Sequence, residues 1–86
     1  MKAIWKFQIE SSTKYDLPQG SEILYGDFQE GKTYVWAAVN PEELDTETYR
    51  VSILGTGETV DEFPGQYLNT VLTGPYVWHF FVEKLS

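Results

Sequence analysis

Apolar and polar residues alternate with a period of two along much of the chain. The pattern is clearest in residues 2–10, where one set of positions is apolar and the other is polar apart from Ile4. The apolar set is Ala3, Trp5, Phe7 and Ile9, and the polar set is Lys2, Lys6, Gln8 and Glu10. Residues 48–54 repeat the pattern almost as cleanly. Because successive side chains of a strand point to opposite faces, each stretch is predicted to be a strand with one face on a core and one in water.

Two other stretches are apolar at nearly every position. Residues 32–39 contain TYVWAAV, and residues 76–84 contain YVWHFFV. Strands that are apolar on both faces are typical of the middle of a sheet, or of a sheet whose outer face is covered. Both stretches are therefore predicted to be central strands, with a long loop, a helix or another subunit over the second face.

Turn-forming residues interrupt the chain at short intervals and leave segments that are mostly too short for a typical helix. These segments are rich in Val, Ile, Thr, Tyr, Phe and Trp, which is typical of an all-β domain with many short strands. We predict a single domain over residues 1–86, an all-β antiparallel barrel or sandwich of about six strands. The predicted strands are residues 2–10, 21–29, 32–39, 47–54, 67–72 and 76–84.

The connections between these strands are also partly readable. Residues 21–39 and 67–84 each fit a hairpin, with a glycine in the turn. Residues 41–46 fit either one short helical turn, for which Asn40 is a suitable N-cap, or an acidic loop. Residues 56–67 form the longest irregular segment.

Composition narrows the class of protein. Of the 86 residues, 42% are hydrophobic and 16% aromatic, which suits a small packed core. The chain has no cysteine, which excludes a disulfide framework, a thiolate metal site and a cysteine nucleophile. It also has no apolar run of membrane-spanning length and no signal-peptide core. These features favour a cytoplasmic protein.

The formal net charge is −7, from 13 acidic and 6 basic residues. The bases are scattered: Lys2, Lys6, Lys14, Lys32, Arg50 and Lys84. Because phosphate backbones are bound through clustered Lys and Arg, nucleic acids and anionic membranes are disfavoured as partners. An acidic surface serves solubility, or the binding of a basic partner protein.

The only histidine, His79, lies within the apolar stretch YVWHFF. Acid–base catalysis requires a partner group within reach, and the nearest acidic residue on the same face of the predicted strand is Glu83. One histidine without cysteine also leaves only carboxylates for a metal site. We therefore predict a structural His79, no catalytic residue, no metal or other cofactor, and a protein that is not an enzyme.

Two further motifs carry little chemistry. The Gly-Thr-Gly sequence at 55–57 follows a predicted strand but lacks the other glycines and the Lys-Ser or Lys-Thr of a phosphate-binding loop. It is interpreted as a turn. The acidic pairs at 42–43 and 61–62 are neighbours in sequence, so they are interpreted as solvated loops and not as the opposed carboxyls of a glycosidase.

Aromatic residues are more numerous than one small core needs, so some are expected at the surface or at the open ends of the sandwich. Exposed Tyr and Trp are favoured contact residues of interfaces. Phe63 and Tyr67, in the loop EFPGQY, are the first candidates. Lys2, Lys6 and Arg50 would add a cationic patch if strands 2–10 and 47–54 were neighbours. The candidate binding surface is therefore Phe63, Tyr67, Lys2, Lys6 and Arg50.

Four segments, MKAIWKFQIE, KTYVWAAVNPEE, RVSILGTGETV and GPYVWHFFVEK, follow one another along the chain. In order and spacing they resemble a family of small proteins encoded largely by tailed bacteriophages and prophages. Members of that family begin Met-Lys-x-Ile-Trp-Lys-Phe and end in a Val-Trp-His-Phe strand. The resemblance implies production in the cytoplasm of an infected bacterium, without catalytic residues to carry over. It also implies that the recurring Trp and His residues serve the fold as much as a site. These residues are Trp5, Trp36, Trp78 and His79.

Small phage proteins of this kind often act by binding, and the same is expected of this chain by analogy. Together with the charge and the aromatic residues, it favours a non-catalytic protein that binds a bacterial host protein, with a counter-defence role. The alternative is an oligomeric sponge for a nucleotide-like immune signal, which requires at least two bases to converge on one pocket. A small enzyme is the third hypothesis. A sheet that is apolar on both faces also invites a homodimer or a higher homo-oligomer.

Overall fold

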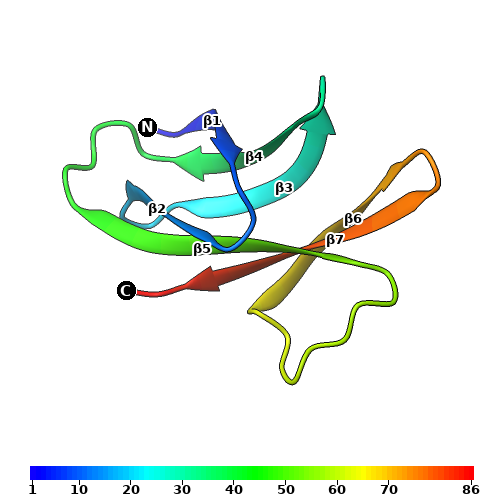
Figure 1. Ribbon diagram of the computed structural model, residues 1–86. Coiled ribbons are helices and arrows are strands. Elements are labelled where there is room, and N and C mark those ends of the chain that lie inside the picture. Colours follow the sequence, from blue (N-terminus) through cyan, green and yellow to red (C-terminus); the bar gives the residue numbers. More distant parts are fainter.

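Seven antiparallel strands in two sheets make up the fold in a computed structural model that describes residues 1–86 (Figure 1). The strands are β1 (Ala3–Ile9), β2 (Thr13–Pro18), β3 (Glu22–Gln29), β4 (Lys32–Val39), β5 (Thr46–Gly55), β6 (Gln66–Thr73) and β7 (Tyr76–Lys84). One sheet has the order β1-β4-β3, and the other has the order β2-β5-β7-β6. The sheets form an open sandwich and not a closed barrel. No helix in the structure is long and apolar enough to cross a membrane.

The all-β prediction is confirmed, and so are the central positions of β4 and β7. The sequence prediction of about six strands omitted β2, which forms the edge of the four-stranded sheet and pairs with β5. This strand is short and ends at Pro18. Only Tyr15 and Leu17 point inward, whereas Lys14 and Asp16 are exposed. Two apolar positions are too few to separate a strand from a polar loop by periodicity.

Residues 41–46 contain no helical turn, which corrects one of the two interpretations of this segment. The side-chain oxygen of Asn40 accepts a hydrogen bond from the Glu42 N–H (3.1 Å), and its backbone carbonyl accepts one from the Glu43 N–H (3.1 Å). An Asn side chain can close a tight turn in this way without a helix after it. Because β5 already begins at Thr46, too few residues remain for a helix.

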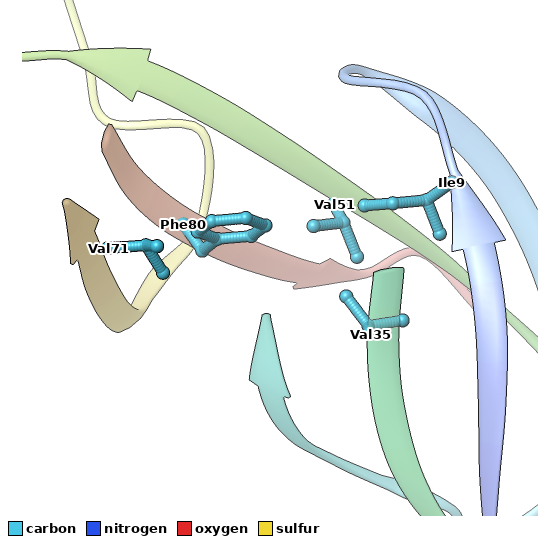
Figure 2. Close-up of a cluster of buried hydrophobic side chains, with 5 residues drawn as sticks. All are labelled: Ile9, Val35, Val51, Val71 and Phe80. Carbon is cyan, nitrogen blue, oxygen red and sulfur yellow. The ribbon is translucent and has the colours of Figure 1, made fainter. Parts of the chain in front are cut away.

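The core lies between the two sheets. Ile9, Val35, Val51, Val71 and Phe80 come from five different strands and point toward one another (Figure 2). A second cluster adjoins it and consists of Leu17, Ala37, Val39 and Tyr49. Both clusters use alternate residues of their strands, so the two-residue periodicity of the sequence becomes the inner face of the sandwich.

The edge strands β3 and β6 of the two sheets are joined by one side chain. Asn69 accepts a hydrogen bond from the Gly26 N–H and donates one to the Gly26 carbonyl, both at 2.8 Å. The amide group of Asn69 thus takes the place of a neighbouring strand. Gly26 is required here because a Cβ atom would overlap the ring of Phe80.

A β-bulge in β6 makes this link possible. The register of β6 against β7 shifts between Tyr67 and Asn69, which pair with Phe81 and Phe80 and leave Leu68 without a partner. In a regular strand, Tyr67 and Asn69 would point to the same face. The bulge turns Asn69 toward the inside of the sandwich and leaves Tyr67 on the outer face of the four-stranded sheet.

Candidate functional site

The loop of residues 56–65 folds over the outer face of the four-stranded sheet, at the opposite end of β5 from residues 40–45 (Figure 1). Beneath it, Phe81 points outward from β7 but is buried. The ring of Phe63 stacks on that of Phe81, with centroids 5.3 Å apart and planes 10° apart. Tyr67 meets the ring of Phe81 edge-on at 5.9 Å. The second apolar face of β7 is therefore covered by a long loop, one of the three expected covers.

A hollow of about 320 Å³ lies beside these rings. Its residues are Leu54, Gly55, Thr56, Gly57, Glu58, Phe63, Tyr67, His79 and Phe81. Phe63 is 70% exposed and Tyr67 is 58% exposed, so both predicted surface rings are confirmed as exposed. The volume is at the lower end of the ~300–1,000 Å³ range of small-molecule sites. The hollow has aromatic walls and a polar rim, and its volume suits a small chemical group.

His79 is fixed at the wall of the hollow by hydrogen bonds at both ring nitrogens. Nε2 lies 2.7 Å from Thr56 Oγ1, and Nδ1 lies 2.9 Å from Thr70 Oγ1. Thr70 Oγ1 is in turn 2.6 Å from the hydroxyl of Tyr67. Since a hydroxyl can donate or accept, either tautomer of the imidazole is satisfied. The hydrogen bonds connect His79 to the loop through Thr56 and to Tyr67 through Thr70. The structural role of His79 stays a prediction.

Glu58 forms the rim of the hollow through a turn. Its Oε2 accepts a hydrogen bond from the Gly55 N–H (2.6 Å), and its own N–H donates to the Gly55 carbonyl (3.1 Å). Between them, Gly57 has φ 97°, a conformation that favours glycine. The Gly-x-Gly sequence is thus a turn that holds a carboxylate at the edge of the hollow.

A second hollow, of about 440 Å³, is also lined by residues of this turn. It shares Gly55, Thr56 and Glu58 with the first hollow and extends to Tyr76, which stacks on Trp78 with centroids 5.9 Å apart. No lysine or arginine lines either hollow. The structure also contains no group of three or more His, Cys, Asp or Glu residues that could hold a metal ion.

The family model for a domain of unknown function, DUF7352, matches residues 1–86. The chain belongs to the DUF7352 family. No curated protein and no solved structure matches it. The family description of this DUF7352 chain names no activity.

The cations of the predicted surface lie away from the hollow in this DUF7352 chain. Lys6 lies on the three-stranded sheet, where its Nζ is 4.1 Å from the ring centroid of Tyr34 and donates to the side chain of Gln29 (2.6 Å). Arg50, on β5, is paired with Glu83 at 2.6 Å. Because β1 and β5 belong to different sheets, the condition for a patch of Lys2, Lys6 and Arg50 is not met.

Phe63 and Tyr67, which were named from the sequence, line the hollow. Thr56, Glu58 and Thr70, which lie around them, were not named from the sequence. The position of Thr70 could have been predicted, because a hairpin with its turn at 74–75 sets Thr70 opposite His79. Thr56 and Glu58 depend on the path of an irregular loop, for which the sequence has no periodic signal.

A separate polar cluster lies at the other end of β5. The hydroxyl of Tyr49 is 2.8 Å from Glu47 Oε2 and 2.9 Å from the Ser21 carbonyl. Burial and the neighbouring Glu47 carboxylate raise the pKa of Tyr49 to about 12. Hydrogen bonds from Tyr49 and Lys84 lower the pKa of Glu47. This cluster ties the segment between β2 and β3 to β5, and we assign it to the fold.

Proposed function

We propose that this DUF7352 protein is a non-catalytic binding protein whose partner is a bacterial host protein, with a counter-defence role in the infected cell. The observation that carries the proposal is the aromatic hollow, whose two outer rings stay exposed although the buried Phe81 lies beneath them. Exposed rings on a rigid scaffold are the typical anchors of protein interfaces. The bacterial host is supported by the resemblance of the chain to phage proteins.

A nucleotide-like ligand is the less favoured alternative. Phosphate groups are bound by Lys, Arg or clustered backbone N–H groups. The hollow has Glu58 at its rim and no base, while Arg50 is already paired with Glu83 and Lys6 lies on the other sheet. The sign of the charge thus supports a protein partner over a nucleotide. Catalysis has little support, since the imidazole of His79 has only hydroxyl partners.

Capture of a partner from bacterial lysate tests the proposal, with Phe63→Ala as the probe. We expect the unchanged protein to retain one host protein, which binds again after purification, and Phe63→Ala to lose it. Leu44→Ala is the matched control, because Leu44 is an exposed apolar residue in the loop at the opposite end of β5. Equal capture by Phe63→Ala, or no capture at all, would contradict the proposal.

Thermal melts with a panel of nucleotides test the alternative. A ligand that binds only the folded state raises the melting temperature by mass action. We expect no shift with any nucleotide. A large upward shift would favour the sponge and contradict a protein partner for this hollow.

A further inference from the structure

The hollow beside the 56–65 loop combines two features that suit a cation. Its walls are the exposed rings of Phe63 and Tyr67, and its rim is the carboxylate of Glu58. Glu58 makes no salt bridge within the chain, and neither do Asp61 and Glu62 in the same exposed loop. The negative charge around the rings is therefore unneutralised by any residue of the protein itself.

The ring geometry leaves an aromatic face available. Phe63 covers Phe81 with one face, in a nearly parallel stack, while 70% of the residue stays exposed. A cation placed over the face of an aromatic ring is attracted by the ring quadrupole. The planar guanidinium group of arginine stacks on such faces more readily than an ammonium group does.

From these contacts we infer that the hollow receives an arginine side chain of the partner protein. The guanidinium stacks on Phe63 and pairs with Glu58, whose Oε1 is not used by the turn. Oxygens of Thr56 and Tyr67 lie among the same lining residues and can accept further guanidinium hydrogen bonds. That the arginine belongs to a host protein rests on the proposed function, whereas the chemistry of the hollow rests on its own residues.

Nuclear magnetic resonance titration with two blocked tripeptides tests this inference. Gly-Arg-Gly carries the guanidinium, and Gly-citrulline-Gly is its neutral isostere. We expect Gly-Arg-Gly to shift resonances of residues 54–58, 63–67 and 79–81, and to bind more weakly as salt is added. Because the citrulline peptide loses the cation stacking and ion-pairing energy, we expect its affinity to be roughly tenfold lower.

Two variants of the protein make the test specific. Glu58→Gln keeps an oxygen acceptor for the Gly55 N–H, so the turn is retained while the charge is lost. We expect Glu58→Gln to lower the affinity for Gly-Arg-Gly about three- to fivefold, the scale of an exposed ion pair. Glu22→Gln removes an exposed acid on β3 of the other sheet and is expected to change nothing.

The outcomes separate this inference from the proposed function. Equal binding of both peptides, shifts elsewhere on the surface, or no shift at the highest peptide concentration would overturn the arginine site. Phe63-dependent capture of a host protein would still support the proposed function in that case. Conversely, a specific Gly-Arg-Gly site without any captured partner would support the arginine site and overturn the proposed function.

Discussion

Strand β7 separates two regions of different character. On its inner face Phe80 is fully buried between two sheets, against Val71 of β6 and Val51 of β5 (Figure 2). On its outer face Phe81 is covered only by the rings of Phe63 and Tyr67, which are themselves exposed. The inner region holds the fold together, and the outer region leaves aromatic surface exposed. One bulge at Leu68 serves both regions, since it directs Asn69 inward and Tyr67 outward.

The largest expected effect is on the inner face. Phe80→Ala removes a fully buried ring and leaves a cavity that the sheets cannot close, so it should lower the free energy of unfolding by about 3–5 kcal/mol. Urea denaturation followed by tryptophan fluorescence measures this. A loss under about 1 kcal/mol would show that the ring is not central to the sandwich. Where Phe80→Ala is too unstable to purify, Phe80→Leu gives the same comparison on a smaller scale.

Gly26→Ala should have the next largest effect. Its new Cβ would overlap the ring of Phe80, and overpacking of this kind destabilises by about 1–3 kcal/mol. The overlap depends on the ring, so Gly26→Ala should cost less in a Phe80→Leu background. A double-mutant cycle measures that coupling. Additive effects would contradict the close approach of the Gly26 backbone to the ring.

On the outer face, Phe63→Ala should change stability little. It removes one exposed ring from a stack, which is worth about 0.5–1.5 kcal/mol. Thermal melting compared with Leu44→Ala checks this expectation. A loss as large as that of Phe80→Ala would mean that the outer rings belong to the core and would remove the contrast between the two faces of β7.

The smallest expected effect is a pH dependence from the cluster around Glu47 and Tyr49. The pKa of Glu47 is lowered from 4.5 in the folded protein, so its stabilising contribution is present above pH 4.5 and is lost as the pH falls through the folded value. The pKa of Tyr49 is raised to about 12, so its contribution is complete below about pH 10 and is lost as the pH rises through 12.

Denaturation midpoints at a series of pH values give a curve of stability against pH, with an acid limb where stability falls at low pH and an alkaline limb where it falls at high pH. Glu47→Gln should flatten the acid limb, and Tyr49→Phe should flatten the alkaline limb. Glu43→Gln, in the turn before β5, is the control and should keep the acid limb. An unchanged acid limb in Glu47→Gln would show that another carboxylate is responsible.

The sequence predicted the inner region better than the outer one, for a physical reason. Buried faces of strands repeat every two residues, which revealed strands such as β1. Residues 32–39 and 76–84 are apolar on both faces, so β4 and β7 could be recognised as central strands. The short, polar β2 could not. The bulge at Leu68 has no periodic signal, and regular alternation over 67–72 would have turned Tyr67 into the core.

For the outer region, loop composition identified Phe63 and Tyr67 as surface rings, but their neighbours depended on tertiary structure. Glu58 reaches the hollow through a glycine turn. Thr56, the first residue after β5, lies against β7 and reaches His79 there. The predicted cationic patch does not form, for a similar reason. Alternation shows which face of a strand is polar, but the strand order that separates Lys6 from Arg50 is set by the whole fold.

The contrast between the two faces of β7 is tested most directly by measuring partner affinity and unfolding free energy on the same Phe63→Ala protein. We expect the host partner that binds the unchanged protein to be lost, while the free energy of unfolding falls by only about 1 kcal/mol. Undiminished affinity in a variant that is folded and has lost this ring would contradict a binding role for the outer face.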